Sequence, residues 1–209
     1  MSIIPNDYFK CVLALGREPE SKWIATGFLC SKVVGEKQYH FLVTNKHVFE
    51  DKKELYVRLY NKKTKEYESL RVSLVGPQGG MLYSAHPTED VSAAVIHAGL
   101  LIDEGFTWIG FDVEKGMMSS SDYYDEGGDV GSRVFMLGFP MGLVDINKNA
   151  PICRGGYLAR KEETGYLLDI QNFPGNSGSP IISCPELVAV PGTKAMKSCA
   201  LIGIVSSYC

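Results

Sequence analysis

Short apolar runs recur along the whole chain and are separated by clusters of glycine, asparagine, lysine or proline. In the first half, the runs occupy residues 11–15, 25–30, 40–44, 55–60, 70–75 and 91–96. In the second half, they occupy residues 133–137, 156–159, 166–170, 180–183 and 200–205. Runs of this length between turn-forming residues are typical of β-strands, and no segment keeps a helical period over three turns. The pattern therefore predicts an all-β protein.

Residues 112–129 separate the two series of runs and differ from them in composition. This segment is acidic and rich in small residues, as expected of an exposed connection between domains. Many short strands with frequent turns are typical of sandwiches and barrels. We therefore predict an N-terminal β-barrel over residues 1–111, a linker over 112–129 and a C-terminal β-barrel over 130–209.

Composition and charge narrow the classes of function. The 209 residues are 45% hydrophobic and 22% charged, as in ordinary globular proteins. No apolar run approaches the ~18 residues of a membrane-spanning helix. The net charge of −3 disfavours a nucleic-acid binder, because such proteins usually carry a basic excess. We therefore expect neither a membrane nor a nucleic acid as a partner.

The cysteines bear on metal binding and on the redox compartment. The six cysteines are scattered without the spacing of zinc ligands, so we expect no metal site. The first ten residues lack the basic and apolar regions of a signal peptide. We therefore expect reduced thiols and a cytoplasmic location, unless a longer natural N-terminus directs export. Cys11 and Cys30 lie in apolar runs and should be buried.

The segment 173–180, F-P-G-N-S-G-S-P, is the first candidate for chemistry. Ser177 has glycines on both sides and precedes an apolar run. Glycine permits positive φ and a close approach of the backbone to a bound group, and acyl transfer needs a hydroxyl beside N–H donors that stabilise an oxyanion. Taken alone, an ordinary turn with an incidental serine explains the segment about as well.

A serine nucleophile needs a base, and the base needs a carboxylate. His47 follows the apolar run 40–44, and Asp90 directly precedes the run 91–96. Each of the two residues, taken alone, is better explained by an ordinary structural role. The order His, Asp, Ser occurs in known catalytic triads, so the three residues together favour a hydrolase. Asp51 and Asp103 are the fallback acids.

Residues 44–48 (T-N-K-H-V), 90–95 (D-V-S-A-A-V) and 174–180 (P-G-N-S-G-S-P) resemble the three signature segments of trypsin/chymotrypsin-fold serine proteases. The resemblance is strongest to the HtrA/Deg-like bacterial branch. Residues 25–29 and 131–140 also resemble strands of that family, so the similarity spans roughly residues 10 to 208. The resemblance implies two packed antiparallel six-stranded β-barrels, with the active site in the cleft between them.

The resemblance further implies a serine endopeptidase that needs no cofactor and acts on a protein or peptide. Ser177 would attack the peptide carbonyl, His47 would accept and return the proton, and Asp90 would orient His47. The loop of Gly175, Asn176 and Ser177 would form the oxyanion hole. Because Asn stands where tryptic zymogens carry an acid, we expect no activation by trimming of the N-terminus.

Substrate-binding residues are also implied by the resemblance. Gln171 resembles the floor of the pocket for the P1 side chain, and Ser206, Ser207 and Tyr208 resemble the edge strand that pairs with the substrate. An uncharged floor disfavours Lys or Arg at P1, because no carboxylate would neutralise a buried cation. An inward Tyr208 would favour a small side chain. The sequence ends one residue later, where the family continues, so either it is truncated or another segment completes the pocket.

Two functions therefore stay open. The first is an active serine endopeptidase with narrow specificity or gated activity. The second is a catalytically poor module of the same fold that binds a partner peptide in its cleft. A structural β-protein ranks far behind, because it would need no histidine, aspartate and serine in this order.

Overall fold

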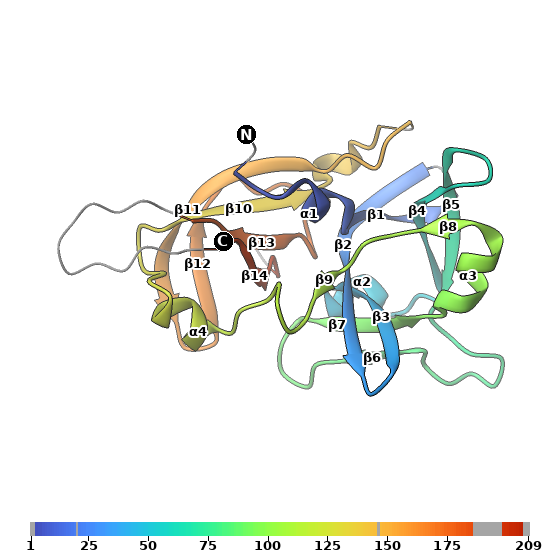
Figure 1. Cartoon of the computed structure of the whole chain (residues 1–209), viewed down its shortest axis with the longest axis horizontal. Coiled ribbons are helices and arrows are strands. Elements are labelled where there is room, and N and C mark those ends of the chain that lie inside the picture. The colour runs from blue at the N-terminus through green and yellow to red at the C-terminus, as the bar shows by residue number, and fades with distance from the viewer. Residues whose placement is uncertain (1–2, 20, 146, 186–197, 207–209) are drawn as a thin grey trace.

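The structure is a computed structural model that describes residues 3–19, 21–145, 147–185 and 198–206. Two β-sheets, formed by successive halves of the chain, are its main elements (Figure 1). The all-β prediction is confirmed, because the helices are short and lie only at the ends of strands and in connections.

The first sheet contains nine strands and has the main order β5-β4-β1-β2-β3-β7-β6. Its strands are β1 Val12–Glu18, β2 Ser21–Val34, β3 Lys37–Thr44, β4 Glu54–Asn61, β5 Glu66–Ser73, β6 Tyr83–Ala85, β7 Ser92–Ile96, β8 Phe106–Thr107 and β9 Phe111–Asp112. All pairings are antiparallel except that of β2 with β9. The Leu82 N–H donates to the Leu74 carbonyl at 2.9 Å, and an isolated bridge joins Val75 to Met81. These contacts bring the two ends of the sheet together.

The second sheet contains five strands among the described residues, in the order β12-β11-β10-β13-β14. Its strands are β10 Arg133–Gly138, β11 Ile152–Glu162, β12 Gly165–Asp169, β13 Pro180–Ser183 and β14 Ala200–Ile204. The resemblance implied six strands in each barrel. Instead, the first sheet gains the two- and three-residue strands β6, β8 and β9, which are too short to show as separate apolar runs.

The helices are α1 Asn6–Lys10, α2 Lys46–Phe49, α3 Ala98–Glu104 and α4 Ser120–Asp125, with a 3₁₀ turn η1 at Pro140–Gly142. None is long enough to display a helical period in the sequence. Helix α4 lies within the segment that we expected to be an exposed linker. Its first turn is capped by Ser119 and Asp122, and Tyr123 is fully buried against the second sheet. In the described part of the chain, no helix is long and apolar enough to cross a membrane.

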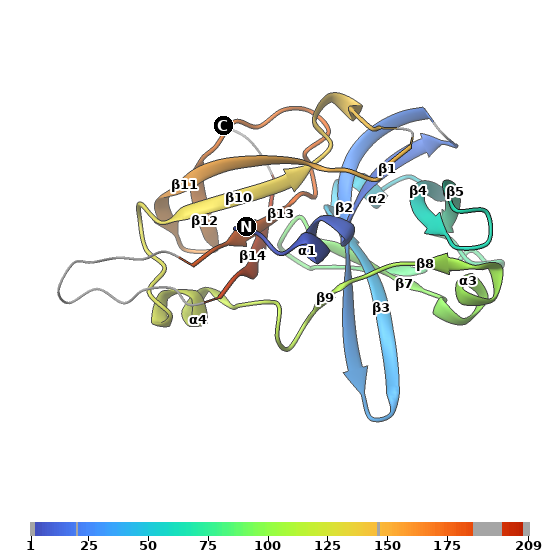
Figure 2. The ribbon, with the colours of Figure 1, turned by 45° about the horizontal axis from the view of Figure 1, so that its top comes forward.

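A shared apolar core joins the two sheets. Phe28 and Phe111 from the first sheet pack with Leu137 and Ile182 from the second. Helix α1 lies at this junction (Figures 1 and 2), and the ring of Tyr8 meets that of Phe111 edge-on, with the ring centroids 4.9 Å apart. The junction between the sheets is therefore fixed by buried apolar packing.

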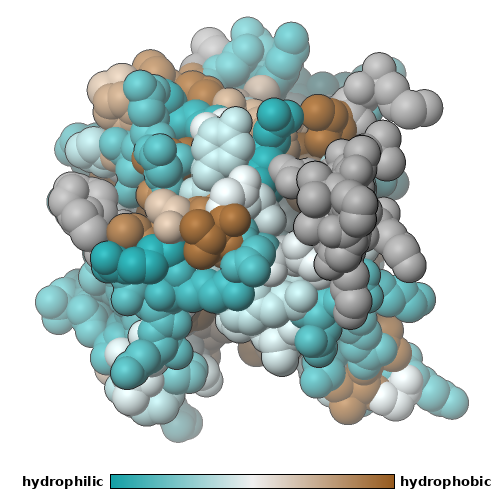
Figure 3. Space-filling model, turned by 90° about the vertical axis from the view of Figure 1, so that its left-hand side faces the viewer, coloured by the Kyte–Doolittle hydropathy of each residue, from teal (hydrophilic) through white to brown (hydrophobic). Residues whose placement is uncertain are grey.

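The end of the molecule that carries β11, β12 and α4 is mainly hydrophilic, with apolar side chains in small groups (Figure 3).

Candidate active site

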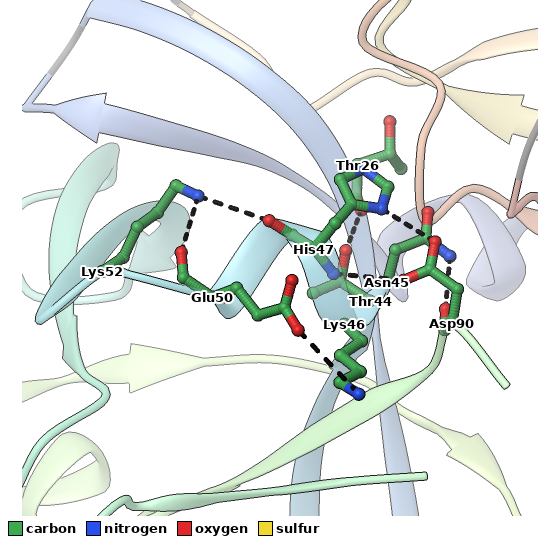
Figure 4. A network of polar contacts seen from close by, with 8 residues as sticks. All are labelled: Thr26, Thr44, Asn45, Lys46, His47, Glu50, Lys52 and Asp90. Carbon is green, nitrogen blue, oxygen red and sulfur yellow. Dashed lines mark hydrogen bonds and ion pairs between the residues drawn. The ribbon is translucent and has the colours of Figure 1, made fainter. Parts of the chain in front are cut away.

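His47 and Asp90 lie side by side although 43 positions separate them in the sequence. The Nδ1 atom of His47 is 2.7 Å from Oδ2 of Asp90 (Figure 4). The backbone N–H of His47 donates to the other carboxylate oxygen, Oδ1, at 3.1 Å. One carboxylate therefore holds both the ring and the backbone of His47, and Nε2 is the ring nitrogen left for proton transfer.

The pairing of β3 with β7 creates this contact. Thr44, the last residue of β3, lies opposite Ser92, the first residue of β7. Just beyond this pair, one strand leads into α2 with His47, and the other comes from the loop with Asp90. The side chain of Asn45 donates to the backbone carbonyl of Asp90 at 2.8 Å (Figure 4). Residues just beyond the end of an antiparallel ladder are neighbours in space, so the strand register positions the pair.

The pair is open to solvent on one side and supported on the other. The side chain of His47 is 49% exposed and that of Asp90 is 32% exposed, so both can be reached from solvent. On the supporting side, Nζ of Lys52 donates to the backbone carbonyls of His47 and Glu50 at 3.5 and 3.3 Å (Figure 4). Desolvation lowers the pKa of Lys52, and the positive charge of Arg17 adds to this effect.

Ser177 lies in the loop that leads into β13, and two glycines shape this loop. Gly175 and Gly178 have φ values of +96° and +85°, which other residues rarely adopt. A Cβ atom on Gly178 would lie 2.1 Å from the carbonyl oxygen of Thr26, and one on Gly175 would lie 2.5 Å from that of Phe139. Both positions therefore require glycine for its backbone conformation and for space.

Thr26 of β2 links the Ser177 loop to the strand that precedes His47. Its backbone N–H donates to the carbonyl of Ser177 at 2.9 Å. Its hydroxyl donates to the carbonyl of Gly175 at 2.8 Å and accepts from the N–H of Phe139 at 3.0 Å. Thr44 in turn donates its hydroxyl to the carbonyl of Thr26 at 2.8 Å. No role was predicted for Thr26, and the only signal in the sequence was its place in the motif at 25–29.

The backbone N–H groups of the Ser177 loop differ in whether they donate a hydrogen bond. Within the described ranges, those of Gly175 and Ser177 donate no hydrogen bond, whereas that of Asn176 donates to the carbonyl of Phe173 at 3.1 Å. Two of the three residues expected in the oxyanion hole thus have an available N–H group, and Asn176 does not. Among the same residues, the structure shows no hydrogen bond between the Ser177 hydroxyl and His47.

A cavity of about 750 Å³ lies beside Asp90. Its lining includes residues of β12 and β14, the two edge strands of the second sheet. Apolar side chains of Leu168, Ile181 and Ile202 form part of its wall. The lining also contains three carboxylates, which belong to Glu89, Asp90 and Glu162. The cavity lining therefore combines apolar side chains with acidic groups, one of which is Asp90 of the histidine–aspartate pair.

Of the expected substrate-binding residues that the structure describes, one lines the cavity and one does not. Ser206 lines the cavity, and so does Asn172, which the sequence analysis did not single out. Gln171, expected at the pocket floor, is exposed and does not line the cavity. Its side-chain oxygen accepts from Nη1 of Arg154 at 3.1 Å, which turns it toward β11. Ser207 and Tyr208 lie outside the described residues.

The overall fold is similar to that of a solved protease domain. The crystal structure of the MamO protease domain from Magnetospirillum magneticum, in its apo form, matches over 94% of both chains with a TM-score of 0.51 and 12% identity. The chain has a trypsin-like serine-protease fold. Rv3671c from M. tuberculosis, in an inactive mutant form, matches over 93% of this chain and 82% of that chain, with a TM-score of 0.49 and 15% identity. No protein-family model and no curated protein matches the chain.

In this protease fold, the candidate residues come from both sheets. His47 and Asp90 follow and precede strands of the first sheet, and Ser177 precedes β13 of the second. In the described part of the chain, no group of three or more His, Cys, Asp and Glu residues is placed to hold a metal ion.

Proposed function

We propose that this chain is a serine endopeptidase in which Ser177 is the nucleophile, His47 the general base and Asp90 the residue that orients His47. The observation that carries the proposal is the double contact of the Asp90 carboxylate with His47, at 2.7 and 3.1 Å. A carboxylate on Nδ1 selects the tautomer whose Nε2 accepts a proton, and it stabilises the imidazolium that forms.

The loop around Ser177 supplies the second support for this proposal. Its backbone is hydrogen-bonded to Thr26 of β2. The strand next to β2 in the sheet, β3, ends just before His47. Among the described residues, the Gly175 and Ser177 N–H groups donate no hydrogen bond, and in this proposal they bind the oxyanion. Donors fixed in advance are effective because they need no reorganisation when charge develops in the transition state.

The reaction would follow the known template of serine proteases. The Ser177 oxygen attacks the peptide carbonyl while Nε2 of His47 takes its proton, and the two N–H groups stabilise the oxyanion. The intermediate collapses to an acyl-enzyme, and His47 returns the proton to the departing amine. Water, deprotonated by His47, then hydrolyses the ester and restores Ser177.

The substrate side chain at P1 would enter the cavity beside Asp90. Because Leu168, Ile181 and Ile202 form part of its wall, we propose that an uncharged side chain of small or medium size, such as Val or Leu, packs against these residues. Asn172→Asp would add a carboxylate to the three already in the lining, so it should raise cleavage after Lys or Arg relative to the wild-type protein. We also propose narrow or gated activity in a bacterial cytoplasm, because an unrestrained peptidase there would damage the cell.

A fluorophosphonate probe, which labels activated serines, tests the proposal. The wild-type protein and the control Ser84→Ala, which removes an exposed serine on β6, should be labelled. Ser177→Ala should not be labelled. Asp90→Asn should react about 10⁴-fold more slowly, because it reverses the tautomer of the histidine. Equal labelling of Ser177→Ala, or no labelling of the folded wild-type protein, would contradict the proposal.

The alternative is a module of the same fold that binds a partner peptide without cleaving it. The observation in its favour is that, over the described residues, Ser177 makes no hydrogen bond to His47, although such contacts are often loose in unliganded enzymes. A peptide library separates the two functions. An endopeptidase releases fragments, and Ser177→Ala abolishes this release, whereas a binding module retains intact peptides in both proteins.

A further inference from the structure

We propose that Cys184 and Cys199 form a reversible disulfide, so that the second sheet carries a redox modification site. Their sulfur atoms lie 3.2 Å apart. This closeness departs from the expectation that all six cysteines act as separate reduced thiols. The proposal does not depend on peptidase activity, because it concerns the opposite end of β13 from Ser177.

The pairing of β13 with β14 brings the two cysteines together. Ser183 lies opposite Ala200 in the antiparallel ladder, so Cys184 and Cys199 occupy the next opposed positions. Opposed residues of antiparallel strands have Cα atoms about 4.5–5.5 Å apart, within the range of about 4.4–6.8 Å that a disulfide spans. The sulfurs need only approach from 3.2 Å to a bond of about 2.05 Å, which side-chain rotation can supply.

The surroundings assign different roles to the two thiols. Cys184 is 2% exposed, whereas Cys199 is partly exposed and so is the thiol that an oxidant reaches. The sulfur of Cys199 also contacts the carbonyl of Ile3 at 3.3 Å, and its backbone carbonyl accepts from the Tyr8 hydroxyl at 3.0 Å. Desolvation raises the pKa of Cys199, and the hydrogen bond with Cys184 opposes that rise. Cys199 therefore reacts first, and Cys184 resolves the product.

Among the remaining described cysteines, Cys11 and Cys30 are close enough to interact electrostatically, but both are buried. Cys153 is exposed on β11 and, among the described residues, contacts no other thiol. Burial raises the pKa values of Cys11 and Cys30 to about 12, so few of these thiols ionise and attack an oxidant. Only Cys184 and Cys199, within the described ranges, combine proximity with access.

The oxidant in this proposal is a small-molecule disulfide such as oxidised glutathione. The Cys199 thiolate attacks one glutathione sulfur, which forms a mixed disulfide and releases one glutathione thiolate. The Cys184 thiolate then attacks the Cys199 sulfur and releases the second glutathione thiolate. The two protons from the protein thiols protonate the released thiolates, so one oxidised glutathione becomes two reduced molecules.

The bond would stabilise the hairpin that carries the Ser177 loop. It closes the chain between residues 184 and 199, and a loop of about this length raises the melting temperature by about 6–12 °C in a chain of this size. At the other end of this hairpin, the N–H of Gly178 donates to the carbonyl of Val205 at 3.1 Å. Oxidation would therefore link β13 and β14 covalently at the end of the hairpin opposite to that contact.

The test equilibrates the full chain in glutathione buffers of increasing oxidised fraction. Each sample is quenched in acid, denatured, alkylated and mapped by peptide mass spectrometry. We expect Cys184 and Cys199 to lose their labels together, a linked peptide pair to appear, and the melting temperature to rise by about 6–12 °C. Dithiothreitol should reverse all three changes.

Matched variants separate this site from general oxidation. Cys199→Ala and Cys184→Ala should each abolish the linked peptide and the thermal shift, and Cys153→Ala should retain both. Because Cys199 is partly exposed, its variant keeps the test usable if Cys184→Ala fails to fold. A bond that involves any other cysteine, a persistent glutathione adduct on Cys199, or full labelling of all cysteines in the most oxidising buffer would overturn the proposal.

Discussion

The hydroxyl of Thr26 makes two buried hydrogen bonds in the contact between the two sheets. Thr26 is fully buried, as is Phe139, and Gly175 is buried with them. Thr26→Val replaces the hydroxyl by a methyl group of similar size. The carbonyl of Gly175 and the N–H of Phe139 then lose their partner at 2.8 and 3.0 Å, and no water can replace it without a cavity.

The size of this effect follows from the two orphaned groups. Each buried polar group left without a partner costs about 1–3 kcal/mol, so Thr26→Val should lower the free energy of unfolding by about 2–6 kcal/mol. For a chain of this length, the melting temperature should fall by roughly 5–20 °C. Thr26→Ser keeps the hydroxyl and loses one methyl group, so it should cost only about 1 kcal/mol.

Equilibrium unfolding in urea, followed by the fluorescence of Trp23 and Trp108, measures these differences. The decisive comparison is between the valine and serine variants, because both alter the side chain and only valine lacks the hydroxyl. If Thr26→Val is as stable as Thr26→Ser, the two hydrogen bonds contribute nothing and our reasoning about the loop is wrong. If the proposed function holds, Thr26→Val should also lower kcat more than it raises KM, because the loop carries the oxyanion donors.

Three further predictions concern other residues. Gly178→Ala forces a Cβ atom to within 2.1 Å of a β2 carbonyl at φ +85°, so its free energy of unfolding in urea should fall by at least about 2 kcal/mol. Desolvation lowers the pKa of His40, so as the pH falls the unfolded state binds a proton before the folded state does, and the free energy of unfolding should decrease below about pH 6.5. His40→Phe should make the free energy of unfolding less dependent on pH in this range. An unchanged pH dependence would mean that other groups cause it. Burial raises the pKa values of Cys11 and Cys30 to about 12, so a thiol reagent should modify Cys153 in the native protein and reach the other two only after unfolding.

Local pattern in the sequence was sufficient for the all-β class and for the candidate residues. The length of each apolar run and the turn residues between runs predict strands, because these preferences act within a few neighbouring residues. The glycines around Ser177 also indicated a turn from local sequence alone, because glycine itself permits a positive φ. The pattern of three motifs also indicated His47 and Asp90, which the structure brings to within 2.7 Å of each other.

Contacts between distant residues were decided only by the tertiary structure. The hydroxyl of Thr26 meets a carbonyl 149 positions away, and the sequence around either residue does not show this bond. Gln171 was expected in a pocket, and only the structure shows that it is hydrogen-bonded to Arg154 of β11 and does not line the cavity. Helix α4 and the strands β6, β8 and β9 are too short for their residues to display a period.

The pairing of Cys184 with Cys199 shows the physical reason for this division. In the sequence they are two isolated cysteines, and only the register of β13 against β14 makes them opposed neighbours. Strand propensity and turn chemistry arise from each residue and its neighbours in the chain. Register depends instead on which side chains the whole sheet buries, because a slip of one residue turns every side chain to the other face. The sequence alone therefore determined the longer strands, and the packing of the sheets decided which residues meet.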